Sequence, residues 1–192
     1  MPRAASLLKV LRVPLVTVLA VITFTGCGFQ LRGTSPVPTA LQPLAVDCPD
    51  ALPGRFCQSV RDQLTLGGIE LQDPAQADYV LRLRNYQQDR RASAITAQAA
   101  AAEYLLRHTV TIELFTANRV PLIAATDLSA SETYRFDETN VLAKQREEEE
   151  LRQQLGNRLA QQVIFRLAPM TRERIEAAIE SHSASQGTEE SP

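Results

Sequence analysis

The segment AAEYLLRHTVTIEL, residues 101–114, decides the fold of this chain. Apolar side chains recur at every second position in it, and a period of two places them on one face of a β-strand. The residues on that face are Tyr104, Leu106, Val110, Ile112 and Leu114. His108 shares the face, and we expect a satisfied interior or rim histidine there rather than a ligand. The segment therefore predicts a long strand with one buried face.

The residues after this strand predict a hairpin. Thr116–Arg119 is a plausible turn in which Asn118 takes the left-handed conformation that asparagine tolerates. A return strand then runs from Val120 to about Tyr134. The pattern is that of two antiparallel strands joined by a short turn.

A long helix follows the return strand, and we expect Asp137 or Thr139 to cap it. Apolar residues four apart form one stripe along this helix, which Pro169 ends: Leu151, Leu155, Leu159, Val163 and Leu167. The four carboxylates Glu147–Glu150 point to most sides of the helix, so they predict a solvated early segment rather than a catalytic pair. Acidic residues near a helix start also complement its dipole.

The residues before the long strand predict one more helix and shorter strands. The helix opens at Pro53-Gly54 and ends at Gly67-Gly68, with apolar residues every four positions at Phe56, Val60 and Leu64. Strands are expected at Leu41–Asp47, Ile69–Leu71 and Tyr79–Arg84. Residues 87–100 lack both periods and predict a loop or an irregular strand edge.

The order of these elements predicts a single α+β domain over residues 41–170. Two helices pack on one face of a small, about four-stranded sheet of mixed or antiparallel strands. Residues 27–40 contain Gly33, Pro36 and Pro38 and predict an extended tether. Residues 171–192 predict a polar, disordered tail, with one last helical turn or two at Ile175 and Ile179 before its most polar part, Ser181–Pro192.

Residues 1–26 are typical of a secretory signal peptide, with a basic start and a short apolar run at 13–24. That run is too short to span a bilayer, which needs about 20 residues. Thr25-Gly26-Cys27 resembles the lipobox of bacterial lipoproteins, which makes Cys27 the lipidated first residue of the mature chain. Gly28 at the next position fits the outer membrane. An ordinary secreted protein with a free thiol at Cys27 is the alternative.

The composition of the mature chain restricts its partners. Removal of 26 of the 192 residues leaves 166, enough for one domain with a real core. The signal contains three of the 20 basic residues and none of the 22 acidic ones, so the formal net charge falls from −2 to −5. A chain this acidic, with no basic cluster, is not expected to bind nucleic acid.

Two cysteines remain after lipidation, Cys48 and Cys57. In an oxidising compartment the default is a disulfide, and the intervening PDALPGRF allows the chain to turn back on itself. Two free buried thiols are the alternative. A metal site is not expected, because His108 and His182 are the only histidines and neither shows ligand spacing. No other cofactor is expected.

Four motifs in order resemble the lipopolysaccharide-assembly lipoprotein LptE family, over nearly the whole mature chain except the tail. They are GCGFQLRGT at 26–34, RDQLTLGGIEL at 61–71, AAEYLLRHTVTIEL at 101–114 and TYRFDETNVLAKQREEEELRQQL at 133–155. The resemblance implies two helices on a four-stranded sheet and a non-enzymatic role. It implies an outer-membrane lipoprotein, facing the periplasm and the barrel lumen, that plugs the LptD β-barrel, helps the barrel to fold, binds lipopolysaccharide and assists its insertion into the outer leaflet.

Lipopolysaccharide is anionic, so its binding residues should be Arg or Lys. Lys144 is the first candidate and lies in the Leu-Ala-Lys of the fourth motif, although it can instead pair with Glu147 or Glu148 along the helix. Arg90 and Arg91 rank after it. LptE-like sequences carry a basic residue in this region, but nearer Ala-Glu-Tyr, where this chain has alanines and Gln98.

Two other functions compete with this interpretation. A lipoprotein hydrolase would need a nucleophile with a base, a carboxylate pair or a metal cluster, and the sequence contains no Gly-x-Ser-x-Gly, P-loop or His-rich motif. A generic structural lipoprotein that faces the periplasm would lack lipopolysaccharide binding. Co-purification distinguishes an LptE-like protein from a generic lipoprotein, because the LptE-like protein should be recovered together with a β-barrel of much larger mass.

Overall fold

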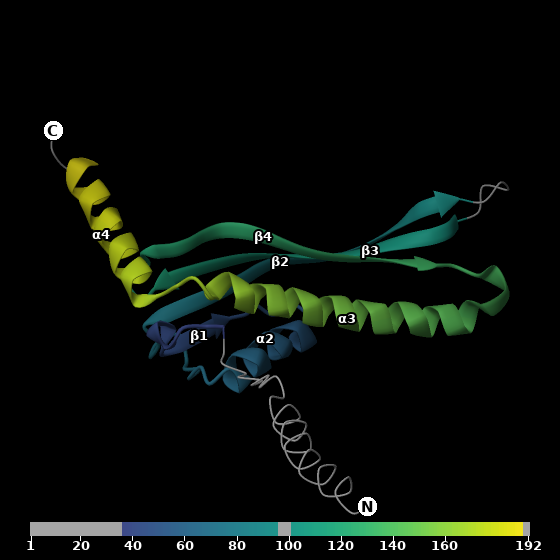
Figure 1. The fold of residues 1–192 in the computed structure, drawn as a ribbon, viewed down its shortest axis with the longest axis horizontal. Helices are drawn as coiled ribbons and strands as arrows, with labels where there is room; N and C mark the ends of the chain where they lie inside the picture. The colour runs from purple at the N-terminus through teal and green to yellow at the C-terminus, as the bar shows by residue number, and fades with distance from the viewer. Residues whose placement is uncertain (1–35, 96–100, 190–192) are drawn as a thin grey trace, which may run out of the picture. The chain divides into compact units, whose positions relative to one another are not determined.

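The structure is a computed structural model that describes residues 36–95 and 101–189, all within one structural unit, Thr34–Pro192. In chain order the elements are the 3₁₀ helix η1 (Thr39–Leu41), β1 (Leu44–Asp47), α2 (Gly54–Leu66), β2 (Tyr79–Ile95), β3 (Ala101–Thr116), β4 (Pro121–Arg135), the 3₁₀ helix η2 (Glu138–Asn140), α3 (Val141–Leu167) and α4 (Arg172–Glu189) (Figure 1). The predicted signal peptide, the lipobox with Cys27 and the first part of the tether lie outside the described residues.

The four strands form one sheet in the order β1-β2-β3-β4. β1 pairs with β2 in parallel, and the crossover between them contains α2. The β2–β3 and β3–β4 pairs are antiparallel. Helices α2 and α3 lie on the same side of the sheet (Figure 1). The predicted α+β class, with two helices on one face of a four-stranded mixed sheet, is confirmed.

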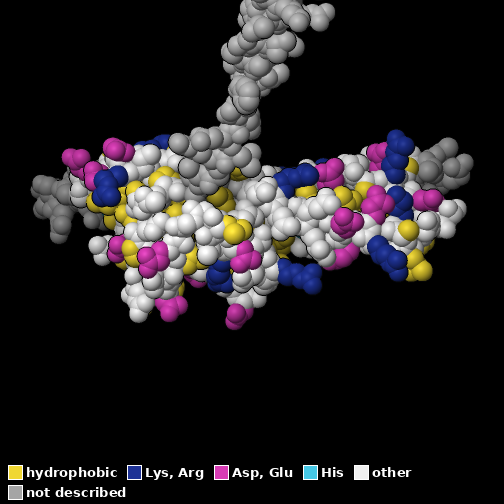
Figure 2. Space-filling view, turned by 60° about the horizontal axis from the view of Figure 1, so that its bottom comes forward, with side chains coloured by type: hydrophobic (Ala, Val, Ile, Leu, Met, Phe, Trp, Pro, Cys, Tyr) yellow, Lys and Arg dark blue, Asp and Glu magenta, His cyan; other side chains and the backbone are white. Residues whose placement is uncertain are grey.

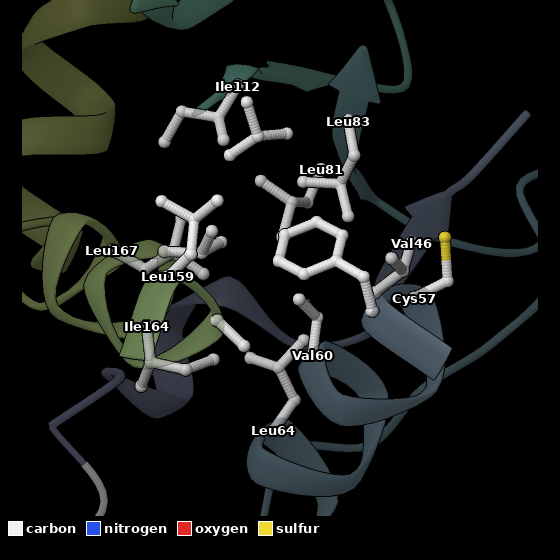
Figure 3. Packing of buried hydrophobic residues seen from close by; sticks show 14 of the residues in the cluster. Val46, Cys57, Val60, Leu64, Leu81, Leu83, Ile112, Leu159, Ile164 and Leu167 are labelled. Carbon is white, nitrogen blue, oxygen red and sulfur yellow. The ribbon is translucent and has the colours of Figure 1, made fainter. Parts of the chain in front are cut away.

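The apolar core lies where both helices cover the sheet (Figure 3). Val60 and Leu64 of α2 meet Leu159 and Leu167 of α3 there. The sheet contributes Leu81, Leu83, Ile112 and Leu114, and all eight side chains are fully buried. Burial of one such side chain stabilises the fold by about 1.5–3 kcal/mol. These contacts explain why the residue periods of α2, β3 and α3 predicted those elements correctly.

Strand β2 runs to Ile95, so of the two alternatives predicted for residues 87–100, residues 87–95 form the irregular strand and not the loop. A bulge between Arg84 and Gln87 explains the difference. Asn85 adopts a left-handed conformation with φ of 53°, and the extra residue changes which positions face the helices. Leu81 and Leu83 point to α2 and α3 before the bulge, whereas Tyr86 does so after it. The alternation is therefore interrupted in the middle of a continuous strand.

The hairpin between β3 and β4 is present, but Arg119 rather than Asn118 takes the left-handed conformation, with φ of 65°. A loop of three residues that ends in a left-handed residue is a common hairpin connection. The Thr116 amide donates to the Val120 carbonyl (3.0 Å) and closes the loop. The strand predicted at Ile69–Leu71 is also wrong, because only a single bridge joins Leu71 to Leu44.

The start of the domain and of α3 also differ from prediction. Val37 and Leu41 are buried in the core, so residues 37–40 belong to the domain and not to an extended tether. Asp137 caps η2 by accepting a hydrogen bond from the Thr139 amide (2.9 Å). Helix α3 then begins at Val141, after Asn140, whose side chain makes no capping hydrogen bond.

Helix α4 contradicts the predicted disordered tail, because the chain is helical as far as Glu189. Ile175 anchors the helix, with its side chain 4% exposed and part of the main core. Serine hydroxyls further along the helix donate to carbonyl groups three residues earlier, as Ser181 does to Ala178 (2.9 Å). These local hydrogen bonds satisfy the serine hydroxyl groups on the helix itself.

Candidate functional site

A polar cluster joins the sheet to α3 beyond the part that α2 covers. We call Arg90, Tyr104, Tyr134, Glu148 and Arg152 the distal cluster. The Arg90 guanidinium carbon lies 3.5 Å above the centre of the Tyr104 ring, and Arg90 Nε lies 3.1 Å from both Glu148 Oε2 and Tyr134 Oη. Glu148 also accepts hydrogen bonds from Tyr134 and from Arg152, one turn along α3. One carboxylate therefore connects two strands and a helix.

The cluster affects the protonation of its members. Partial burial raises the pKa of Glu148, but hydrogen bonds from Tyr134 and Arg152 and the charge of Arg90 outweigh that effect and lower the pKa below its usual value. The pKa of Tyr134 is raised, by burial and then by its hydrogen bond to Glu148. Glu148 thus stays ionised and Tyr134 stays a donor. The expectation of a solvated Glu147–Glu150 segment is wrong for Glu148, whose side chain is 16% exposed.

His108 is buried, as the sequence predicts, and its Nδ1 lies 2.9 Å from Tyr86 Oη. The Tyr86 ring in turn packs on Phe56, with centres 4.8 Å apart. Burial and then the nearby charge of Arg152 lower the pKa of His108, so the imidazole is neutral. His108 is a satisfied interior residue. Its ring contacts Tyr86, and the charge of Arg152 in the distal cluster acts on its pKa.

A pocket of about 400 Å³ lies beside the distal cluster. Arg90 and Phe136 line it from the sheet side, and Gln145, Glu148 and Arg152 line it from α3. Its charged groups are already in contact with one another, because Arg90 and Arg152 share Glu148. The pocket can accept a polar ligand only as an addition to these contacts.

The structure brings two of the three predicted lipopolysaccharide-binding residues to this region. Arg90 is a member of the distal cluster, and Lys144 lies one helical turn before Glu148 on α3. Lys144 Nζ is 2.7 Å from Glu147 Oε2, which is the intrahelical pair that the sequence left open. Arg91 lies on the other face of the sheet, because consecutive strand residues point to opposite faces. Its side chain is exposed and has no ion pair or hydrogen bond to any residue that the structure describes.

The structure joins Cys48 and Cys57 in a disulfide, with their Cα atoms 6.2 Å apart. The bond connects the residue after β1 to the first turn of α2. Cys57 is buried in the main core, and Cys48 packs at its edge.

Sequence reasoning missed Glu148, Tyr134 and Arg152 as parts of one site. The three carboxylates around Glu148 are exposed, so only the position that faces the sheet differs from its neighbours. The available signal was the helical stripe. Glu148 precedes Leu151 and Leu155 by three and seven residues, which places it on the same side of the helix.

Three further findings concern the described residues as a whole. Among residues 36–95 and 101–189 there is no group of three or more His, Cys, Asp or Glu side chains placed to hold a metal ion. Within the same described ranges, no helix is both long and apolar enough to cross a membrane. On the face shown in Figure 2, basic and acidic side chains are interspersed rather than gathered by sign.

Comparison with known proteins identifies the family. The sequence profile of LptE, described as lipopolysaccharide-assembly, matches residues 41–167. The chain belongs to the LptE family. The matched region runs from the end of η1 to the end of α3, so it includes both the apolar core and the distal cluster.

Curated LptE relatives agree with the profile. The LPS-assembly lipoprotein LptE of Yersinia pestis (strain Pestoides F) is 33% identical over 153 residues, which cover 78% of this chain and 72% of the relative. The LPS-assembly lipoprotein LptE of Yersinia pseudotuberculosis serotype O:1b (strain IP 31758) gives the same values. The predicted family is therefore confirmed, and a role in lipopolysaccharide transport follows from it.

Solved structures of other lipoproteins share the LptE fold. A minor lipoprotein from Acinetobacter baumannii superposes with a TM-score of 0.58 at 25% identity, over 69% of this chain and 94% of that one. Lipoprotein B from Nitrosomonas europaea superposes with a TM-score of 0.62 at 18% identity, over 81% of this chain and 97% of that one. The second likeness shows the fold alone.

Proposed function

We propose that this chain is an outer-membrane lipoprotein that binds lipopolysaccharide and acts as the plug and assembly partner of an LptD β-barrel. The observation that carries the proposal is the LptE profile match over residues 41–167, together with relatives named as LPS-assembly lipoproteins. The protein acts by binding and not by catalysis. It uses its folded domain to contact the barrel and its cationic side chains to contact the glycolipid.

The lipid anchor is proposed at Cys27. The lipobox-like Thr25-Gly26-Cys27 supports it, and so do relatives that are named lipoproteins. Each CH₂ buried in the bilayer contributes about 0.8 kcal/mol, and two or more chains make the attachment stable. Wild-type protein from membranes should carry the mass of the lipid, and Cys27→Ala should lack it. A wild-type mature mass without the lipid increment would refute the anchor.

Lipopolysaccharide binding is proposed for the distal end of the domain, led by Lys144 on the first turns of α3. Among the residues that the structure describes, the ion pair of Lys144 is with Glu147, an intrahelical contact of a few tenths of a kcal/mol that a phosphate group can replace. Arg91 adds an exposed guanidinium on the opposite sheet face. Arg90 is committed to Glu148 and Tyr134, so we propose that it supports the site more than it contacts the ligand.

The barrel partner is tested by recovering the protein from membranes in a mild detergent. An affinity-tagged full-length chain should arrive with one outer-membrane barrel of much larger mass, in a fixed ratio. A tagged outer-membrane lipoprotein from another family serves as the control and should not recover that barrel. A full-length chain that is found free in the periplasmic fraction, or in the membrane with no such partner, would contradict the proposal.

A further inference from the structure

A second pocket opens at the place where the first turn of α2 faces the middle of α3. Its volume is about 250 Å³. Arg55 and Phe56 line it from α2, Tyr86 and Gln88 from β2, and Gly156 and Asn157 from α3. It adjoins the pocket of the distal cluster, because Glu149 and Arg152 line both. It does not contain Lys144.

Gly156 is the feature that keeps this pocket open. Glycine is among the poorest residues for a helix interior, yet Gly156 lies well inside the 27-residue α3. Packing does not require it, because an added Cβ would meet only Tyr86 Oη, at 3.8 Å, which is an ordinary contact. A side chain at this position would instead extend over Tyr86 and into the pocket. The glycine therefore weakens the helix and leaves space beside the Tyr86 hydroxyl, at the edge of an oriented aromatic ring.

The floor of the pocket is rigid. Tyr86 packs on Phe56 and is bonded at its hydroxyl to His108 and, at 3.3 Å, to the Gln88 amide. A ring held on two sides presents one fixed face. A flat apolar surface of this kind suits the C–H face of a small ring-shaped ligand.

The walls offer hydrogen-bonding groups that are only partly used. Asn157 Oδ1 accepts from Ser59 Oγ (3.1 Å), which leaves its amide N–H groups available. Gln153 Nε2 donates to Glu149 (3.2 Å), which leaves its amide oxygen available. Arg55 is exposed and makes no ion pair or hydrogen bond with any described residue. Amides both donate and accept, as hydroxyl groups do, whereas a free guanidinium matches a carboxylate in a bidentate arrangement.

We propose that this pocket binds one acidic sugar unit, with its ring on Tyr86, its carboxylate at Arg55 and its hydroxyl groups at Gln153 and Asn157. The volume lies below the range of about 300–1,000 Å³ that suits larger ligands, so a single unit fits. Glu149 on the wall favours a singly charged carboxylate over a doubly charged phosphate. The inference rests on the proposed function only for the identity of the glycan that carries the sugar.

The test is an NMR titration of the full chain in detergent with free glucuronate, and with glucose and inorganic phosphate in parallel. Glucuronate should bind with saturation and perturb Tyr86, while glucose should bind more weakly. Arg55→Ala should weaken glucuronate binding about tenfold or more, since a charge-assisted contact is lost, and bring it to the level of glucose. Arg174→Ala removes an exposed arginine of α4 outside the pocket and should change nothing.

Two substitutions at Gly156 test the geometry independently of charge. Gly156→Ala should raise the melting temperature by a few degrees, because alanine is the better helix former. Gly156→Leu should fill the space over Tyr86 and abolish glucuronate binding in protein that retains the wild-type circular dichroism. If Gly156→Leu does not fold, Gly156→Ala carries the test and should still weaken binding.

The outcomes separate this inference from the proposed function. Equal binding of glucose and glucuronate, or tighter binding of phosphate that also requires Arg55, would overturn the acidic sugar. Unchanged glucuronate binding in both folded Gly156 variants would overturn the pocket. If no sugar binds while the barrel still co-purifies, this inference fails and the proposed function stands. If the barrel is absent and glucuronate binds as described, the reverse holds.

Discussion

The two halves of the sheet are attached to α3 by different kinds of contact. In the proximal half, which α2 also covers, fully buried aliphatic side chains such as Leu83, Ile112 and Leu159 make the interface. In the distal half, which begins at Tyr86 on β2, buried apolar side chains such as Leu106 are joined by the polar contacts of Arg90, Tyr134 and Glu148. Large apolar side chains at the distal end are exposed, such as Leu142 at 74%.

The difference indicates which half sets the global free energy of unfolding and which half can open locally. Apolar burial is non-directional and adds up over many contacts. A buried polar cluster depends on every member, because removal of one partner leaves the others unsatisfied. We therefore expect the proximal half to set the global free energy of unfolding. The distal half should open locally at lower free energy, as ligand-binding regions commonly do.

The largest effect is expected in the proximal core. Leu159→Ala removes a fully buried side chain between α2, α3 and the sheet. It should lower the free energy of unfolding by about 2–5 kcal/mol, because it loses apolar burial and leaves a cavity. Urea denaturation measures the change. Leu142→Ala, an exposed leucine of the same helix, is the control and should change it by less than about 0.5 kcal/mol. Similar losses in both variants would contradict the comparison.

The disulfide should give the next effect, also in the proximal half. Replacement of Cys48 and Cys57 by alanine opens a short loop between β1 and α2 and should lower the free energy of unfolding by about 2–3 kcal/mol. Thiol titration of unfolded, non-reduced wild-type protein should find neither cysteine reactive. Two titratable thiols would exclude the bond.

In the distal half, Glu148→Gln should lower the free energy of unfolding by about 1–3 kcal/mol, because Arg90 and Arg152 lose their shared carboxylate while partly buried. Amide hydrogen exchange should speed up in β2 beyond Tyr86 and in the first turns of α3, and stay slow in α2. Glu149→Gln, an exposed neighbour, is the matched control. A uniform increase in exchange over both halves would show that the distal half does not open by itself.

A pH effect is expected at the junction of the halves. The pKa of His108 is lowered in the folded state by burial and then by Arg152, so the unfolded chain binds a proton first as the pH falls. The contribution is fully present above the ordinary pKa of about 6.5 and is lost progressively as the pH falls towards the folded pKa. The melting temperature should therefore drop between pH 7.5 and 5.5. His108→Gln should show a smaller drop, and an equal drop would exclude His108 as its source.

The smallest effect on stability is expected at Lys144. Its pair with Glu147 is a surface contact, so Lys144→Asp should change the free energy of unfolding by less than about 1 kcal/mol. We expect the same variant to weaken lipopolysaccharide binding clearly. Arg146→Asp, an exposed position two residues away, controls for the change in net charge. Equal weakening by both variants would remove Lys144 as a specific site.

Sequence reasoning predicted an element correctly where apolar burial alone determines the pattern of its residues. The apolar stripe of Leu155 and Leu159 and the alternation around Ile112 reflect burial alone, and both elements form as predicted. It left distal β2 open between a loop and an irregular strand, because the bulge at Asn85 interrupts the alternation and the side chains that face α3 are polar there. It failed in α4 because Ile175 is the buried apolar residue of this long polar helix, and one such residue gives no helical period in the sequence.

The candidate site was predictable only in part. Charge and family motifs indicated Lys144 and Arg90, and the structure places both near Glu148, while their binding of lipopolysaccharide stays a prediction. Residues 90 and 91 both lie in β2, so the side chain of Arg91 points to the sheet face opposite to that of Arg90. Glu148 could not be distinguished from its three acidic neighbours by composition, since only its partners on two strands make it different.

Hydrogen exchange of the full-length chain with and without lipopolysaccharide tests most directly whether the distal half binds the glycolipid on a proximal scaffold. The account predicts added protection in residues 88–95 of β2 and in the first turns of α3 from Val141, with α2 unchanged beyond its first turn. Protection confined to α2 and to the last turns of α3, or no change anywhere under saturating ligand, would contradict it.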